Sequence, residues 1–191
     1  MDYWTVNLAP RRDRDFCFLG RGPSDEDDLQ AWMSMGRSVA ASYGDPLEFH
    51  FEEHSPGMQL PSLLGNTRSL FMVARAVKDA IAALSTGPIE FLPFVLFNHK
   101  GRLASRDYFI VNPLGSFDAI DPDRSVIERR ATGSVRLKGL PVLRRDKLDQ
   151  APDLFRIPEN LFDHVVSDRF IDALRPLKPT NVLLTKLQVS G

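Results

Sequence analysis

Strand-like segments occupy most of this chain and helical segments are few, which is the strongest constraint on its fold. Leu47, Phe49 and Phe51 alternate with polar residues, as expected for a half-buried strand. Further apolar runs bounded by turn residues lie at residues 89–97, 108–111, 116–120, 135–137, 154–157 and 181–189. Because these runs do not alternate regularly with helices, the pattern favours an α+β fold with a mostly antiparallel sheet.

About three helices are expected. Ser24 is a suitable N-cap for the first, because its hydroxyl can accept a free backbone N–H. Apolar residues recur on one face of the second from about Thr67 to Leu84, and the third begins at Ser167 and ends at Pro176. Residues 73–80 and 166–173 are similar, and each is followed by a proline-containing turn and an apolar strand. This similarity predicts a weak internal duplication in which two helix–strand units pack on the same sheet.

Length and cysteine content indicate one soluble domain, residues 1–191. A chain of this length can bury a substantial core. The single cysteine, Cys17, cannot form an internal disulfide, which is typical of a reducing compartment. The first residues lack the apolar stretch of a signal peptide, and no run of about 18 apolar residues occurs. We therefore expect a cytoplasmic protein with no membrane partner.

The net charge of −1 conceals an uneven distribution. Residues 1–66 contain five basic and eleven acidic residues, and the acidic excess is densest at Asp25, Glu26, Asp27 and Asp28. The basic excess is densest between Arg124 and Lys147. Charge of one sign is informative about partners rather than about fold. The basic stretch contains no aromatic residue for base stacking, so we expect no nucleic-acid partner, although a nucleic-acid-binding protein remains one alternative.

The search for a catalytic centre yields weak candidates. Residues 50–54 match the H-x-x-E-H zinc pattern, but that chemistry needs a helix, and the period-two alternation here indicates a strand. On a strand, His50 and His54 would lie on a solvated face. Cys17 is expected to be buried and inert, and His164 is expected to face outward from a strand. We expect no catalytic residues, no metal and no cofactor; a small metal-dependent hydrolase using His50, His54 and Asp118 or Asp121 is the other alternative.

Several passages together resemble one family of bacterial proteins. The first is Tyr-Phe-Ile-Val-Asn-Pro-Leu at residues 108–114, followed by Phe-Asp-Ala-Ile-Asp at residues 117–121. The second is Leu-Phe-Arg-Ile at residues 154–157, then Val-Val-Ser-Asp at residues 165–168 and the helix after it; Glu-Phe-Leu-Pro at residues 90–93 also fits. These passages are similar to the immunity protein family of polymorphic toxin systems that is numbered eleven. The resemblance covers residues 70–187, within a family-like part from residue 67 to residue 191.

The resemblance implies a binding protein without chemistry of its own, whose partner is a cognate toxin domain. Asn112, Pro113, Asp118 and Asp121 are expected to be structural: the polar side chains would bond backbone groups at turns, and proline fixes φ. A toxin that acts in the cytoplasm would be a nuclease or a nucleotide-targeting enzyme with a basic cleft. The carboxylates of residues 25–28 are the expected counterpart of such a cleft.

Overall fold

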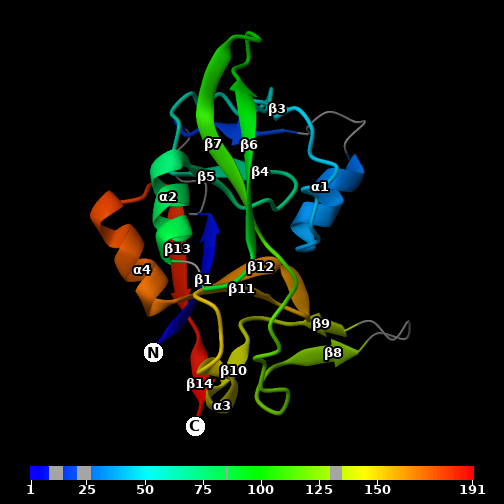
Figure 1. Ribbon diagram of the computed structural model, residues 1–191, viewed down its shortest axis with the longest axis vertical. Coiled ribbons are helices and arrows are strands. Elements are labelled where there is room, and N and C mark those ends of the chain that lie inside the picture. Colours follow the sequence, from blue (N-terminus) through cyan, green and yellow to red (C-terminus); the bar gives the residue numbers. More distant parts are fainter. Residues whose placement is uncertain (9–14, 21–26, 85, 130–134) are drawn as a thin grey trace.

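The computed structural model describes residues 1–8, 15–20, 27–84, 86–129 and 135–191. Its largest sheet has the strand order β2-β4-β5-β7-β6-β3. The bounds of these strands are Phe18–Leu19 (β2), Leu47–His50 (β3), Leu63–Asn66 (β4), Met72–Ala74 (β5), Ile89–Phe97 (β6) and Leu103–Pro113 (β7). β6 and β7 form a long antiparallel hairpin within this sheet, with β5 beside β7 and the edge strand β3 beside β6 (Figure 1).

The six-stranded sheet curls until its two edges nearly meet. Leu19 of β2 forms a bridge with Phe51, which directly follows β3. Two backbone hydrogen bonds close the same seam, from Glu52 N to Phe18 O at 2.7 Å and from Gly20 N to His50 O at 3.3 Å. The enclosed core is rich in aromatic and long apolar side chains, including Phe49, Phe94, Met72, Leu96 and Tyr108. The alternation seen at residues 47–51 is thus confirmed, since its apolar members face this core.

A second sheet of four strands has the order β11-β12-β1-β13 and is antiparallel throughout. Its strands are Tyr3–Leu8 (β1), Leu154–Ile157 (β11), Asn160–Ser167 (β12) and Val182–Lys186 (β13). Two smaller pairs complete the strands: Ile127–Arg129 (β8) with Val135–Leu137 (β9), and Val142–Arg144 (β10) with Gln188–Ser190 (β14). Most pairings are antiparallel, and the fold is α+β, as predicted.

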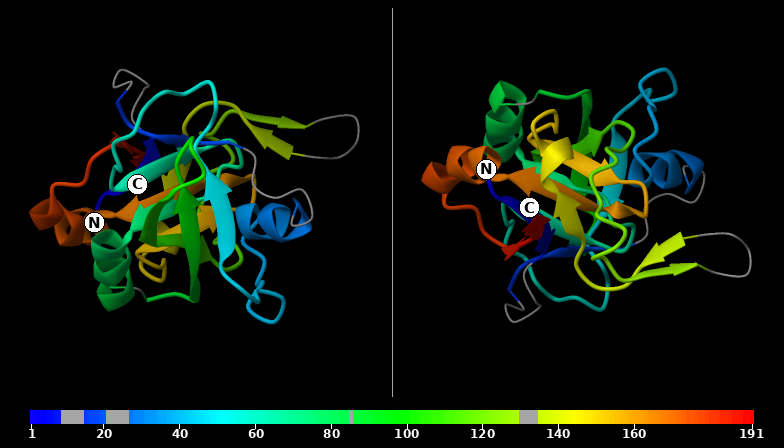
Figure 2. Two further views of the ribbon diagram at one scale, coloured as in Figure 1. Left: turned by 90° about the horizontal axis from the view of Figure 1, so that it is seen from above. Right: turned by 90° about the horizontal axis from the view of Figure 1, so that it is seen from below.

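Two helices lie side by side against these sheets (Figure 1). These are α2, Arg75–Leu84, and α4, Asp168–Leu174, which continues into a 3₁₀ turn, η2, Arg175–Leu177. Val77 and Ile81 of α2 and Phe170 and Leu174 of α4 fill a second core between the sheets. The remaining helices are α1, Asp27–Ser34, and α3, Arg145–Leu148. Both views of Figure 2 place α1 and α4 on opposite sides of the molecule.

The prediction for the third helix is confirmed at its start. The Ser167 hydroxyl accepts the Phe170 N–H at 3.2 Å, so Ser167 is the N-cap of α4. The strand expected at residues 89–97 has the same bounds as β6. The first helix begins at Asp27, and the proposed cap Ser24 lies outside the described residues.

The second helix starts later than predicted, because residues 67–74 form a turn and a strand. Asn66 Oδ1 accepts the N–H groups of Arg68 and Leu70, at 3.1 and 3.0 Å, and Ser69 has a positive φ of 56°. This turn replaces the first helical turn. Residues 72–74 then pair with β7 as strand β5. The apolar residues of this buried strand precede those of the amphipathic helix α2, and together they imitate the apolar face of one long helix.

Three other expectations need correction. Residues 116–120 are not a strand, since only Ile120 forms an isolated bridge, with Leu143. Residues 181–189 form two strands, because β13 pairs with β1 whereas β14 pairs with β10. The two similar helix–strand units do not pack on one sheet, since β6 and β13 belong to different sheets. Across the described ranges, no helix is long and apolar enough to cross a membrane.

Candidate functional site

The passages that carry the family resemblance meet around one segment, residues 33–40, which includes the end of α1. Arg156 reaches this segment from β11, Asn112 and Pro113 reach it from the end of β7, and Glu90 reaches it from the start of β6. β11 belongs to the four-stranded sheet, whereas β6 and β7 belong to the six-stranded sheet. We call this group of side chains and the backbone that it bonds the motif network.

Arg156 is the centre of the motif network and one of the largest fully buried side chains, at 1% exposed. Its guanidinium donates to the carbonyl oxygens of Met33 at 3.1 Å, Ser34 at 3.0 Å and Pro113 at 3.3 Å, and also to that of Leu161. Burial lowers the pKa of Arg156 to about 10, so the side chain stays charged at neutral pH. In the described part of the chain no carboxylate pairs with it, and the hydrogen bonds of its charged guanidinium all go to backbone carbonyl oxygens.

Glu90 and Asn112 hold the next residues of the same segment. The Glu90 carboxylate accepts the Ser38 hydroxyl at 2.5 Å and the backbone N–H groups of Val39 and Ala40, both at 3.2 Å. Asn112 Nδ2 donates to Glu90 Oε2 at 3.0 Å and to the Arg37 carbonyl at 2.8 Å. Burial would raise the pKa of Glu90, but the hydrogen bonds from Ser38, Val39, Asn112 and Ala40 outweigh it and lower the pKa. The ionised Glu90 carboxylate therefore holds residues 38–40 against the start of β6.

Gly36 lets the segment approach this closely. It has φ of +70°, and a Cβ there would lie 2.9 Å from the carbonyl oxygens of both Pro113 and Gly115. The Gly115 N–H donates to the Gly36 carbonyl at 2.8 Å. Together these contacts fix the C-terminal end of α1 to both sheets.

Gly36→Ala is expected to lower the free energy of unfolding by about 3 kcal/mol, because a left-handed φ and two close carbonyl oxygens both oppose a Cβ. Gly139 is the matched control: its φ is +79°, but nothing lies within 4 Å of the position that a Cβ would take. Gly139→Ala should therefore cost only about 1 kcal/mol. Denaturant titration of both variants measures the difference; equal losses would contradict the packing argument.

The predicted contact residues lie at the other end of α1. Asp25 and Glu26 are outside the described residues. Asp27 is the first residue of α1, and Asp28, one residue on, has an exposed side chain.

The expected turn residues differ in what they contact. Asn112 is buried within the motif network, next to Pro113. Asp121 Oδ1 accepts the N–H groups of Asp123 at 3.1 Å and Arg124 at 3.3 Å, and a side-chain hydrogen bond with Ser190 is the main reason why its pKa is lowered. Asp118 is exposed, and its carboxylate makes no hydrogen bond with the described part of the chain. The turn bond expected for Asp118 is thus not seen, because its side chain points into solvent.

The histidines do not form a metal site. His50 lies on β3 with its ring stacked on Phe97, and His54 follows in a turn, so the H-x-x-E-H residues are not on a helix. Over the described ranges, no three side chains of the types His, Cys, Asp and Glu are grouped closely enough to hold a metal ion. The basic stretch contains ion pairs of its own, Lys138 with Glu128 at 3.3 Å and Arg144 with Asp146 at 2.6 Å.

Comparison with known families decides which group this chain belongs to. The model of the immunity protein family Imm11 matches residues 6–189, nearly the whole chain. The chain belongs to the Imm11 immunity protein family. No curated protein matches the sequence. Membership confirms the resemblance to this family, and the structure adds that Asn112, Arg156 and Glu90 of the Imm11 chain all bond the segment of residues 33–40.

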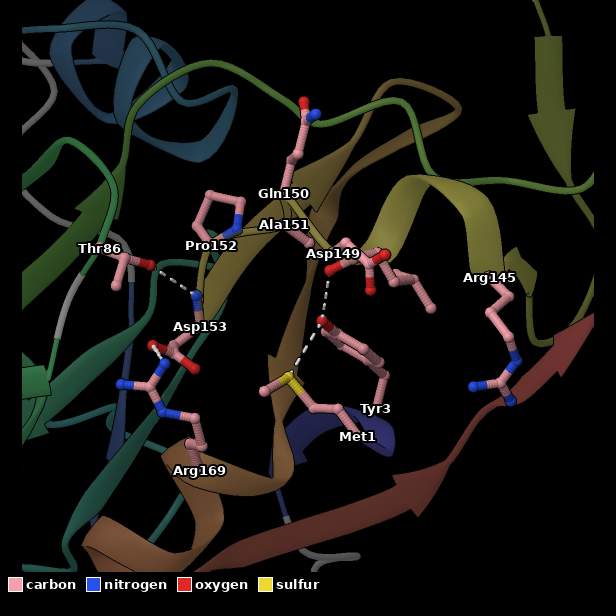
Figure 3. Close-up of a pocket in the computed structure, with 11 residues that line it drawn as sticks. Met1, Tyr3, Thr86, Arg145, Asp149, Gln150, Ala151, Pro152, Asp153 and Arg169 are labelled. Carbon is pink, nitrogen blue, oxygen red and sulfur yellow. Dashed lines mark hydrogen bonds and ion pairs between the residues drawn. The ribbon is translucent and has the colours of Figure 1, made fainter.

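A hollow of about 390 Å³ lies on another part of this Imm11 protein, beside the first residues of the chain (Figure 3). Two of the charged residues that line it, Asp153 and Arg169, contact other groups of the fold. The buried Asp153 accepts the Ser167 hydroxyl at 2.5 Å, and its other oxygen lies 3.5 Å from Arg169. The Tyr3 hydroxyl donates to the Leu148 carbonyl at 3.1 Å. These contacts join β1 to α3, and the residue before β11 to β12 and α4.

His164 is the clearest residue that sequence reasoning misplaced. It was expected to face solvent, but it is buried at 4% exposed, with its ring 4.9 Å from that of Phe71 between the two sheets. Burial, with a contribution from the charge of Arg156, lowers the pKa of His164 well below its usual value. Only the tertiary packing of β12 against the turn at residues 69–71 determines this, so no local signal could have shown it.

Acidification should destabilise the fold through His164. Below about pH 6.5 the unfolded chain binds a proton at this position and the native state does not, so stability falls as pH falls. Between about pH 7 and pH 5 the loss attributable to this residue should approach 2 kcal/mol. We expect His164→Leu to show a shallower decline than wild type in denaturant titrations, while the exposed His50→Gln keeps the wild-type slope. Parallel declines in all three proteins would contradict the assignment.

Proposed function

We propose that this chain is an immunity protein that binds and neutralises a cognate toxin domain in the cytoplasm and has no catalytic activity of its own. The observation that carries the proposal is the Imm11 match over residues 6–189. Because the match includes both sheets and the helices between them, the whole fold and not an isolated motif is what the chain shares with the family.

The motif network supports a binding role through what it holds in place. Arg156, Asn112 and Glu90 attach residues 33–40 to three strands, and α1 ends within that segment. A helix fixed at its end presents its first residues in one orientation, which lowers the entropy lost when a partner binds. We therefore propose that Asp25, Glu26, Asp27 and Asp28 contact the partner.

The chemistry of the partner follows from these four carboxylates. A nuclease or a nucleotide-targeting enzyme holds phosphates in a basic cleft, and a cluster of four carboxylates is complementary in charge to such a cleft. The carboxylates would speed the first encounter and then exclude the phosphates of the toxin's substrate. We propose no nucleic-acid partner, since the 124–147 stretch contains no aromatic residue for base stacking, and two of its cations, Lys138 and Arg144, are paired with Glu128 and Asp146.

Direct binding tests the proposal. The probe is the C-terminal domain of the protein encoded immediately upstream of this chain, carrying an inactivating substitution so that it can be produced safely. Calorimetry should show a complex of one toxin domain with one Imm11 chain and sub-micromolar affinity, the range that specific complexes of standard size reach. A toxin domain from an unrelated system is the specificity control. Equal affinity for both domains, or for neither, would contradict a cognate immunity function.

A further inference from the structure

An apolar groove of about 400 Å³ separates α4 from β13 and is not used by the motif network. Its walls combine the apolar side chains of α4 with those of β1 and β13, and its mouth carries two basic residues. The lining apolar residues are Val6, Leu63, Phe71, Phe170, Ile171, Leu174, Val182 and Leu184, and the basic ones are Arg175 and Lys178. A groove of this size and composition is large enough to accept side chains of a partner.

The groove runs beside an open sheet edge. β13 is the last strand of the four-stranded sheet, and in the described part of the chain no strand pairs with its outer edge (Figure 1). Val182 and Leu184 of β13 line the groove, whereas Leu183 between them is 41% exposed. Because side chains alternate along a strand, a segment added to this edge would point every second side chain into the groove. The edge and the groove therefore form one receptor for an extended chain.

The rim of the groove selects for negative charge. Arg175 is paired with Asp172 at 3.0 Å, but Lys178 has no carboxylate partner within the described ranges. Lys178 also has φ of +46°, a left-handed conformation that a lysine Cβ disfavours, and it stands directly after η2, at a position where glycine is common. A lysine there is less stable than glycine would be, and it places a cation beside the groove that has no carboxylate partner among the described residues.

We propose that β13 and this groove bind an extended segment of the toxin, with alternating apolar side chains and acidic flanks, by adding it as a strand to the four-stranded sheet. The assignment of the segment to the toxin rests on the proposed function; the recognition chemistry does not. α4, which lines the groove, and α1 lie on opposite sides of the molecule, so a substitution in the groove leaves α1 unchanged (Figure 2).

Two variants test the site without disturbing the core. Leu183→Lys puts a charge on the exposed face of the edge strand, which blocks strand addition, and Leu103→Lys is the control at a similarly exposed leucine of β7. Lys178→Gly removes the cation and relieves the left-handed strain. We expect the thermal midpoint of Lys178→Gly to equal or exceed that of wild type, while both groove variants lose roughly tenfold or more in affinity for the upstream-encoded toxin domain and Leu103→Lys loses none.

A synthetic peptide separates this proposal from the proposed function. In the peptide, valine alternates with threonine and glutamates flank both ends; a second peptide has lysines in their place. Titration of the isotope-labelled protein should shift the amide signals of residues 182–186, with binding of the glutamate peptide roughly tenfold tighter than that of the lysine peptide and lost in Leu183→Lys. If the toxin domain binds but the groove variants match wild type, or if neither peptide moves these signals, the groove proposal is wrong. If the peptide binds while the toxin domain does not, the proposed function fails and the groove stands.

Discussion

Replacing Arg156 by alanine is expected to lower the free energy of unfolding by about 4 kcal/mol, near the upper end of single-substitution effects. The guanidinium satisfies carbonyl oxygens on α1, β7 and β12, and its removal leaves them buried without a donor. An unsatisfied buried polar group costs about 1–3 kcal/mol, and partial relaxation around the cavity keeps the total below a simple sum. Denaturant titration measures the loss.

Two further variants show whether the loss comes from this geometry. Arg156→Lys keeps the charge but not the planar set of donors, so it should recover less than half of the stability lost by Arg156→Ala. Arg145, an exposed arginine of α3, is the control, and Arg145→Ala should change stability by less than about 0.5 kcal/mol. A loss below about 1 kcal/mol for Arg156→Ala would show that the motif network does not hold the segment after α1.

The second large effect concerns the rate of toxin capture. Replacing Asp25, Glu26, Asp27 and Asp28 by their amides should slow association with the upstream-encoded toxin domain by about tenfold to a hundredfold at low ionic strength. Since electrostatic steering is screened by salt, the difference from wild type should shrink as salt is raised towards about 1 M. Stopped-flow or surface-based kinetics at several salt concentrations measures both quantities.

Removal of the same number of charges elsewhere is the matched control. The control variant carries amides at four other acidic positions with exposed side chains, Asp45, Glu48, Glu53 and Asp123. It has the same net charge as the test variant, so a difference in association rate reports where the charges lie. If both variants slow association equally, net charge alone acts and the start of α1 is not the contact face. If neither slows it, the partner does not use an acidic surface.

The parts of the fold that could be predicted are those whose signal is local. The β6 strand is bounded by Gly-Pro before it and a turn after it, and α4 has a serine cap at Ser167, so the sequence is enough to place both. The prediction for the region from Thr67 to Ala74 is wrong because a side chain, Asn66, closes a turn that helical periodicity alone does not reveal. The near closure of the large sheet depends on the pairing of residue 19 with residue 51. These residues are far apart in the sequence, so no local pattern reveals that they pair.

The candidate site is visible in the sequence only as separate passages. Glu90, Asn112 and Arg156 each stand within a segment similar to one family, but their convergence on residues 33–40 joins positions about fifty residues or more apart in the chain. A buried arginine bonded only to carbonyls among the described residues has no sequence signature, because its partners are backbone atoms. The buried position of His164 escapes prediction for a similar reason: the ring of Phe71 comes from a distant turn.

Survival of cells that produce the toxin domain is the most direct test of the central claim, that this Imm11 chain neutralises a cognate toxin. Cells would express the active toxin domain encoded upstream, together with this chain or with Arg145→Ala as a folded control. We predict that either protein restores colony formation to the level of cells with an inactivated toxin, and that an unrelated toxin stays lethal. Continued killing by the cognate toxin, in cells where the chain is present in soluble form and in excess, would contradict the account.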